Sequence, residues 1–266
     1  MATCQATLAR TFLSRNTSRI YRNRIVHRRR ARARALVDPR WLDASMQDVS
    51  ILDVRPYTEY LEGHIPHAVH LNLADLGFEG GTESLCTDPS SYIPLLEARG
   101  VDGVRPAVVY DSGEEYQAAL AWWALAVFGH SQCHVLQGGF KEWLTEQGKE
   151  ELYEPCPLKL STQFEASDEP QLHLVTQPSS ATSYAVEVSM SLATYLRDNP
   201  PKDLGTFRQA IQQHMPTRAP DLEHASISDK PISFLALSVH ELPYACYVAM
   251  WWDALSGQKP WAVGCV

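Results

Sequence analysis

The sequence predicts an α/β protein built from two tandem three-layer domains, each with a parallel β-sheet. Short apolar runs alternate with amphipathic segments in residues 36–150, and this pattern is typical of a parallel sheet covered by helices on both faces. A weaker version of the alternation follows in residues 181–266. Trp122 lies twelve positions from Asp111, counted inclusively, and Trp251 lies twelve from His240. The shared interval favours a tandem duplication.

The first half contains start and stop signals for most of its elements. A helix is expected from Asp88, because Asp-Pro-Ser-Ser is a start signal and Tyr92, Leu95 and Leu96 share one face. The long helix expected at 114–128 should end at Gly129. In order, we expect helix 39–43, strand 50–54, helix 58–61, strand 68–71, helix 88–99, strand 106–110, helix 114–128, strand 133–136 and helix 140–146.

The second half is expected to be a degenerate copy. Residues 147–180 are rich in Glu, Pro, Ser, Thr and Gln with little periodicity, so residues 151–180 are interpreted as a linker. Strand 184–188, helix 191–196, strand 232–239 and helix 242–255 are expected beyond it. The chain stops at Val266, where a last strand should lead to a closing helix, so this copy is expected to be truncated.

The basic charge is concentrated at the amino-terminal end. Residues 1–37 hold ten of the 23 Lys and Arg residues, all Arg, and no acid, so 13 basic groups face 31 acidic ones in the remainder. An Arg-rich segment with Ser and Thr but no carboxylate is typical of an organellar transit peptide. We therefore expect residues 1–35 to be a transit segment and the protein to reach the mitochondrial matrix.

A nuclear or cytoplasmic location is the alternative, because the cluster from His27 to Arg34 is also typical of a basic arm. The acidic remainder would repel a polyanion, so nucleic acid is not an expected partner. The sequence contains no run of about eighteen apolar residues, and integral membrane association is not expected.

Neither a metal nor a cofactor is expected. The six cysteines are widely spaced, without a C-x-x-C pair, which favours neither disulfides nor zinc. They are Cys4, Cys86, Cys133, Cys156, Cys246 and Cys265. His64, His67 and His70 are three residues apart, but a Pro-containing turn separates them, so their rings should not converge on a metal ion.

Several motifs in the first half carry a family resemblance. They are Ile51–Ala68, with Asp53-Val-Arg55 and His64-Ile-Pro66, then Val108-Val-Tyr-Asp111, Ala121-Trp-Trp-Ala124 and Gln137-Gly-Gly-Phe140. Through them, residues 36–150 resemble the first domain of two-domain thiosulfate and 3-mercaptopyruvate sulfurtransferases, of the rhodanese family. The resemblance implies two rhodanese-like domains and sulfur carried as a persulfide on a cysteine of the second. The first domain of such proteins normally has Asp at the cysteine position, as Asp111 is here.

The second half departs from that pattern in the segment from Leu237 to Cys246. Matching the internal repeat puts His240 at the cysteine position, and anchoring on Ala245-Cys246 puts Val239 there; neither side chain can hold a persulfide. The segment has no Gly, and Glu241 would oppose a thiolate. Cys246 is the weak substitute candidate, but it should lie within the following helix as a packed core thiol.

A further position points to impaired catalysis, because Leu120 stands where the family has an Arg that holds the anionic substrate. His67 replaces the Gly of the usual turn, which we interpret as tolerated variation. Asp53 and Arg55 are expected to pair structurally. We therefore expect a rhodanese-family protein that is inactive or weakly active, with a small sulfur-donor anion or a protein as its partner. The alternatives are a working sulfurtransferase that uses a non-standard thiol such as Cys246, and a non-enzymatic partner-docking module.

Overall fold

The computed structural model describes residues 35–78, 89–103, 105–130, 132–152, 163–164, 173–175, 184–214, 232–258, 260 and 262–265. Residues 34–266 form one compact unit. Of the expected transit segment 1–35, only Ala35 belongs to the described residues; the basic cluster that ends at Arg34 lies outside them. Within the described part, no helix is long and apolar enough to cross a membrane.

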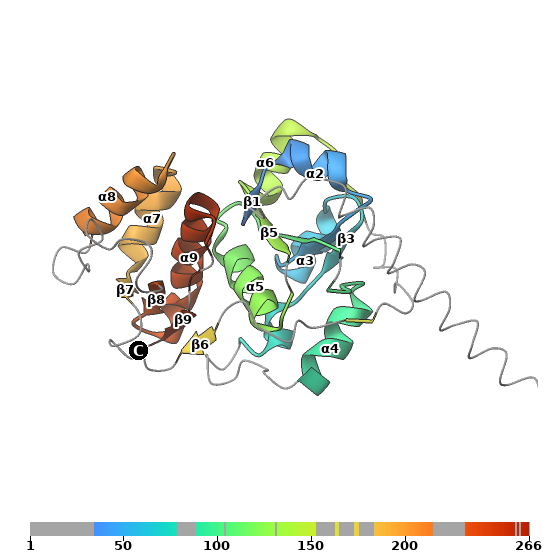
Figure 1. Cartoon of the computed structure of the whole chain (residues 1–266). Coiled ribbons are helices and arrows are strands. Elements are labelled where there is room, and N and C mark those ends of the chain that lie inside the picture. Colours follow the sequence, from blue (N-terminus) through green and yellow to red (C-terminus); the bar gives the residue numbers. More distant parts are fainter. Residues whose placement is uncertain are drawn as a thin grey trace, which may run out of the picture. The chain divides into compact units, whose positions relative to one another are not determined.

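The first sheet has five parallel strands in the order β1-β5-β4-β2-β3. These strands are β1 (Leu36–Val37), β2 (Ser50–Asp53), β3 (Ala68–His70), β4 (Ala107–Tyr110) and β5 (Cys133–Leu136). The residues of β2, β4 and β5 are all buried, as expected for strands packed on both faces. The order turns back on itself beside β2, so the loops after β2 and β4 leave the sheet next to each other. Strands β1, β5 and β3 of this sheet are labelled in Figure 1.

Helices cover both faces of this sheet and produce two cores. One core holds Leu42 of α2 and Trp143 of α6 against Ile51 and Val108. The other holds Trp122 and Trp123, fully buried as expected for helix core residues. The elements are α2 (Pro39–Ser45), α3 (Tyr57–Glu62), the 3₁₀ turn η1 (Leu73–Leu76), α4 (Pro89–Ala98), α5 (Tyr116–Val127) and α6 (Gly139–Glu146). The three-layer α/β prediction is therefore confirmed for this half.

The second sheet has four parallel strands in the order β6-β9-β8-β7. These strands are β6 (His173–Val175), β7 (Tyr184–Val188), β8 (Ile232–Ala236) and β9 (Ala262–Cys265). Their order repeats β1-β5-β4-β2 of the first sheet, which supports the tandem arrangement. A strand equivalent to β3 is missing from the residues that the structure describes.

Three helices, α7 (Met190–Asp198), α8 (Leu204–His214) and α9 (Leu242–Ser256), accompany the second sheet. Helix α8 was not expected, although Phe207, Ala210 and Ile211 are buried at helical spacing. Its start is marked by reciprocal bonds, in which the Thr206 amide donates to Asp203 Oδ1 and the Asp203 amide to Thr206 Oγ1.

Two sequence-based boundaries need correction. Strand β6 lies inside the segment interpreted as a linker, because three residues are too short for a periodic signal. Strand β8 ends at Ala236 rather than at residue 239, because the chain bends at Leu237 and continues into the 3₁₀ turn η3 (Val239–Glu241). Phe164, also in the expected linker, is buried beside Tyr92.

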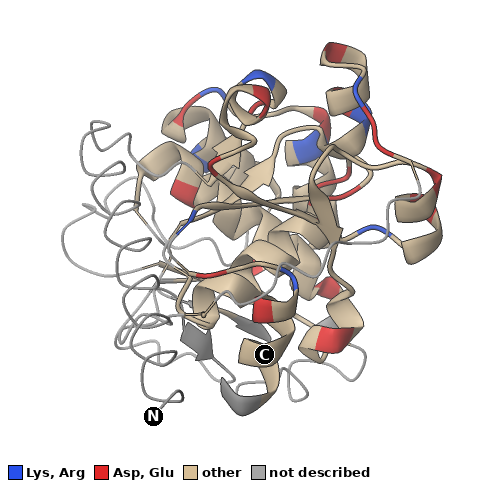
Figure 2. Cartoon of the chain, turned by 90° about the vertical axis from the view of Figure 1, so that its right-hand side faces the viewer, with Lys and Arg blue, Asp and Glu red and all other residues tan. Residues whose placement is uncertain are grey.

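Charged residues lie mainly on the peripheral helices and loops, and the central strands show few of them (Figure 2). Asp53, at the end of β2, is fully buried, and Arg55 and Asp111 are nearly so. A buried charge needs a partner to offset its desolvation. These three residues gather at the carboxyl edge of the first sheet, which is where the chemistry of an α/β fold is usually placed.

Candidate functional site

The loop between β4 and α5 begins with Asp111, whose carboxylate is held by four backbone amides. Its Oδ1 atom accepts hydrogen bonds from the amides of Gly113 and Glu115, at 2.9 and 3.0 Å. Its Oδ2 atom accepts from those of Gln117 and Ala118, at 3.2 and 3.3 Å. Converging N–H groups at the start of a helix form a site for an anion. The carboxylate of Asp111 occupies that site itself.

The electrostatics of Asp111 are dominated by its burial. Burial raises the pKa of the Asp111 carboxyl above its ordinary value, although the four amide hydrogen bonds act in the opposite direction. A carboxylate in this place can cap α5 and fix the loop, but it has no sulfur to carry a persulfide. The geometry of this loop is therefore that of a structural cap.

Glu115 is a second buried carboxyl in the same loop, and the sequence analysis did not identify it. Its backbone is left-handed, with φ of 63°. Its Oε1 atom accepts a hydrogen bond from the Gly138 amide at 2.7 Å, whereas its buried Oε2 atom has no hydrogen-bond partner within the described part of the chain. Burial, together with the charge of Asp111, raises the pKa of Glu115 to about 7, although the hydrogen bond from the Gly138 amide acts in the opposite direction.

The two glycines before Phe140 let the turn between β5 and α6 pack against this loop. A Cβ atom on Gly139, where φ is +55°, would lie 2.4 Å from the carbonyl oxygen of Asp111 and 2.7 Å from the nitrogen of Gly113. The Phe140 amide donates a hydrogen bond to the same carbonyl at 2.8 Å. The Gly-Gly-Phe motif thus allows the close approach of two backbones.

Asp53 and Arg55 form a buried ion pair, as expected. The Arg55 Nη2 atom lies 2.7 Å from Asp53 Oδ2 and also donates to the Gly63 carbonyl at 2.7 Å. The Tyr110 hydroxyl donates to Asp53 Oδ2 at 2.6 Å, and the Arg55 guanidinium lies 3.9 Å from the centre of the Phe140 ring. Burial lowers the pKa of Arg55, but the hydrogen bonds and charge of Asp53 outweigh it and produce a net rise. The pair joins β2, β4 and α6.

The loop after β8 presents different residues at the position of Asp111. Val188 pairs with Ala236 at the ends of β7 and β8, as Asp53 pairs with Tyr110 at the ends of β2 and β4. The residue that follows β8 is Leu237, whose exposed fraction is 54%. Measured from the strand end, Leu237 therefore corresponds to Asp111.

This placement differs from both sequence-based alignments. His240 is exposed and lies in η3 together with Val239, so neither residue directly follows the strand. Trp122 is the seventh residue of α5, whereas Trp251 is the tenth of α9. The Trp pair of α9 is thus displaced by nearly one helical turn. The equal interval in sequence does not align the ends of the strands.

Cys246 lies within α9 and is fully buried. It belongs to the apolar core together with Val248, Ala249 and Met250. Leu120, at the position of the expected substrate-binding Arg, is also buried in that core. The structure therefore does not bring Cys246 to the loop after β8, and it places an apolar core residue at position 120.

The three closely spaced histidines point to different partners. His64 is buried, and its Nδ1 atom lies 2.9 Å from the Tyr60 carbonyl oxygen. The Nε2 atom of His67 lies 3.3 Å from Gln47 Nε2, and that of His70 lies 2.8 Å from the Arg55 carbonyl oxygen. No group of three metal-ligating side chains occurs in the described ranges. His67 has φ of 66°, a backbone conformation that favours the Gly it replaces.

Helix α5 packs against the second half through its first residue. The Tyr116 ring lies 4.9 Å from that of Tyr244 and 5.0 Å from that of Tyr247, both nearly perpendicular to it. Arg197 of α7 forms an ion pair with Glu114 and lies over the Tyr116 ring. Burial, reinforced by the charge of Glu115, raises the pKa of Tyr247. The loop that carries Asp111 is therefore held from both halves.

The sequence is similar to one family. The profile of the rhodanese-like domain matches residues 38–146. A 3-mercaptopyruvate sulfurtransferase from Escherichia coli strain K12 is 32% identical over 119 residues, which is 42% of this chain and 42% of that protein. A thiosulfate sulfurtransferase from Bos taurus is 29% identical over 130 residues, covering 42% of this chain and 44% of that protein. The matched part thus spans less than half of either relative.

The fold has solved counterparts over most of the chain. The crystal structure of SseA from Escherichia coli, a 3-mercaptopyruvate sulfurtransferase, matches with a TM-score of 0.65 and 21% identity, over 87% of this chain and 98% of that one. The 3-mercaptopyruvate sulfurtransferase from Leishmania major matches with a TM-score of 0.59 and 17% identity, over 87% of this chain and 72% of that one. At these identities the likeness concerns the fold, and it extends beyond the first sheet.

Proposed function

Because residues 38–146 belong to the rhodanese-like domain family, we propose that this protein is a sulfurtransferase relative that acts by binding and not by carrying sulfur. The observation that carries the proposal is the chemistry of the two loops at the strand ends. Residues 111–115 and 237–241 contain no cysteine. A persulfide needs a thiolate, which backbone amides and a helix N-terminus stabilise.

The first loop supports a structural role. Its amides already bind the carboxylate of Asp111, so an incoming anion would have to displace a covalently attached competitor. Glu115 adds a second carboxyl beside it. The negative charge of Asp111, joined by that of Glu115 above about pH 7, opposes the binding of a further anion such as thiosulfate.

The second loop supports the same proposal by a different route. Leu237 brings an aliphatic side chain to the strand end, and Glu241 places a carboxylate before α9. Pro243, within the first turn of α9, has no N–H group to donate. This loop therefore offers neither the thiol nor a full set of amide donors.

An assay of the full chain tests the proposal. The protein is incubated with thiosulfate or 3-mercaptopyruvate and with cyanide, and thiocyanate is measured against the E. coli enzyme as the positive control. We expect no rate above that of a protein-free blank. Turnover comparable to that of the control enzyme would refute the binding proposal.

The competing function is sulfur transfer through Cys246. A buried thiol in a helix is poorly accessible to a sulfur donor, and burial in apolar surroundings raises the pKa of a thiol. Intact-mass spectrometry after donor treatment distinguishes the two functions. A gain of one sulfur atom that disappears in Cys246→Ser would establish the competing function.

We also propose that the protein functions in the mitochondrial matrix. The support is the Arg-rich, carboxylate-free composition of residues 1–37. A fluorescent fusion of residues 1–40 should accumulate in mitochondria, whereas nuclear accumulation would favour the basic-arm interpretation.

The partner of the binding function is proposed to be a protein, because the carboxylates of both loops oppose the small sulfur-donor anion that the sequence also allows. In the partner-docking form, residues 36–150 would be sufficient. Comparing their binding to an identified partner with that of the full chain would distinguish a single-domain surface from a two-domain one.

A further inference from the structure

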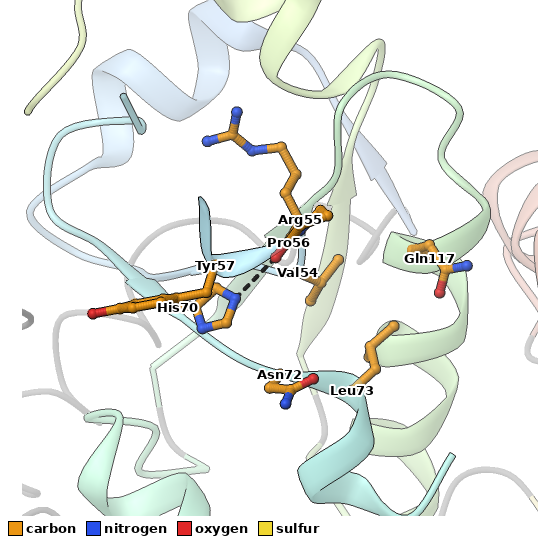
Figure 3. A pocket seen from close by; sticks show the side chains of 8 residues that line it. All are labelled: Val54, Arg55, Pro56, Tyr57, His70, Asn72, Leu73 and Gln117. Carbon is orange, nitrogen blue, oxygen red and sulfur yellow. Dashed lines mark hydrogen bonds between the residues drawn. The ribbon is translucent and has the colours of Figure 1, made fainter. Parts of the chain in front are cut away.

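A pocket of about 380 Å³ opens at the carboxyl edge of the first sheet (Figure 3). It lies where the chain leaves β2 and β3, beside the first turn of α5. Its lining consists of Val54, Arg55, Pro56, Tyr57, His70, Asn72, Leu73 and Gln117. The edge beside β2, where the strand order turns back, is where ligands of open α/β sheets usually bind. The volume suits a small ligand.

The walls of this pocket are aromatic and aliphatic. Tyr57 has an exposed fraction of 57%, and its ring lies 5.1 Å from that of His70. Val54, Pro56 and Leu73 supply aliphatic surface. An exposed tyrosine ring beside an aliphatic wall provides a stacking surface for a flat ligand.

Besides Arg55, the polar side chains of the pocket are an imidazole and two carboxamides, and two of these are oriented by hydrogen bonds. The Nε2 atom of His70 lies 2.8 Å from the Arg55 carbonyl oxygen, which can only accept, so Nε2 carries a hydrogen; in the neutral tautomer with this bond, Nδ1 is an acceptor (Figure 3). The Oδ1 atom of Asn72 accepts from the Ala74 amide at 3.1 Å, which leaves its Nδ2 atom as a donor. Gln117 adds a second carboxamide from α5.

The pocket offers no free charged side chain among the lining residues that the structure describes. Of these, Arg55 is the only Lys, Arg, Asp or Glu. Its guanidinium is engaged by Asp53 and by the Phe140 ring, and Figure 3 shows it directed away from the cavity. An anionic ligand would therefore lose its hydration without gaining a cation in return.

We propose that this pocket binds a small uncharged planar ring whose edge carries a carboxamide or lactam. The ring would stack on Tyr57, the carbonyl oxygen would accept from Asn72 Nδ2, and the N–H group would donate to His70 Nδ1. The inference does not depend on the proposed lack of sulfur transfer, because none of these residues belongs to the loops that would carry a persulfide.

Benzamide and benzoate are matched probes, since they share a shape and differ in charge. Saturation-transfer NMR of the full chain should show benzamide binding in the millimolar range, as expected for a ligand of this size. Benzoate should bind at least about fivefold more weakly, because its charge is not compensated. Equal signals from the two probes, or no benzamide signal at about 10 mM, would overturn the proposal.

Tyr57→Ala and Tyr57→Phe test the location. The alanine variant should lose the benzamide signal, because the stacking ring is gone, whereas the phenylalanine variant should keep it. Retention of the full signal in Tyr57→Ala contradicts this site. A thermal melt verifies that each variant is folded. If Tyr57→Ala does not fold, Asn72→Ala replaces it, and a drop of about threefold in affinity is expected from the lost hydrogen bond to the ligand's carbonyl oxygen.

Discussion

Replacing Glu115 by Gln should remove a large pH dependence from the stability of this protein. The Glu115 carboxyl is buried beside Asp111, and only its Oε1 atom accepts a hydrogen bond, from the Gly138 amide. Gln preserves the shape and that acceptor but cannot ionise. The variant therefore separates the charge of Glu115 from its packing.

The magnitude follows from the pKa of Glu115, which burial raises from 4.5 to about 7. As the pH rises through this interval, the unfolded chain has lost a proton that the folded protein still holds. The free energy of unfolding therefore falls with rising pH, by about 1.4 kcal/mol for each unit. This group's contribution is fully present below pH 4.5, and about 3 kcal/mol of it is lost by pH 7.

Urea unfolding followed by tryptophan fluorescence measures this difference. Between about pH 5 and pH 8, the free energy of unfolding of the native protein should fall relative to that of Glu115→Gln by roughly 2.5 kcal/mol. Asp111, whose pKa is also raised, is present in both proteins; because its charge interacts with that of Glu115, the measured difference reports the titration of the pair of carboxyls. Curves that stay parallel within about 0.5 kcal/mol would show that Glu115 is ionised in the fold and would refute the reasoning.

Three further substitutions test contacts of the first half, two by chemical denaturation and one by thermal melting. Asp111→Ala should lower the free energy of unfolding by at least about 3 kcal/mol, because it leaves four amides without their acceptor, and an unchanged value would show that they are solvated. Gly139→Ala should lower the free energy of unfolding by more than about 3 kcal/mol, because its Cβ would lie 2.4 Å from a backbone oxygen. The control is Gly148→Ala, which has φ of +63° but a nearest contact of 3.8 Å and should lower it by only about 1 kcal/mol. Equal losses in the two variants would exclude the steric cause. His67→Gly should raise the melting temperature, with a gain of up to about 1 kcal/mol from relief at φ of 66°, and a lower melting temperature would show that the contacts of His67 outweigh its strain.

The expected elements of the first half are present because their signals are local. Buried strands such as Ile51–Asp53 read as apolar runs, and the pairing of Asp53 with Arg55 follows from two opposite charges at the end of one strand. The burial of Trp122 and Trp123 likewise follows from an almost entirely apolar helix. Such features need only a few neighbouring residues to be predicted.

The second half was harder because its signals are weak or indirect. Strand β6 has three residues and owes its existence to β9, almost ninety positions later in the chain. The twelve-residue interval to the Trp pair aligned His240 with Asp111. In the structure, however, β8 ends where Ala236 pairs with Val188 of β7, so Leu237 is the residue that follows the strand. The equal interval in the sequence could not reveal that the Trp pair of α9 lies nearly one helical turn further along its helix than the Trp pair of α5.

The sequence by itself determined the α/β class and the lack of cysteine in both loops, since residue type and local periodicity are sufficient for each. Only the tertiary structure decided how the first loop is held. Four amides converge on Asp111, the Gly138 amide binds Glu115, and the backbone of Gly139 lies against the Asp111 carbonyl. The last two contacts join residues more than twenty positions apart, and burial itself depends on every neighbouring element. For that reason no local pattern could reveal that Glu115 would be buried with a raised pKa.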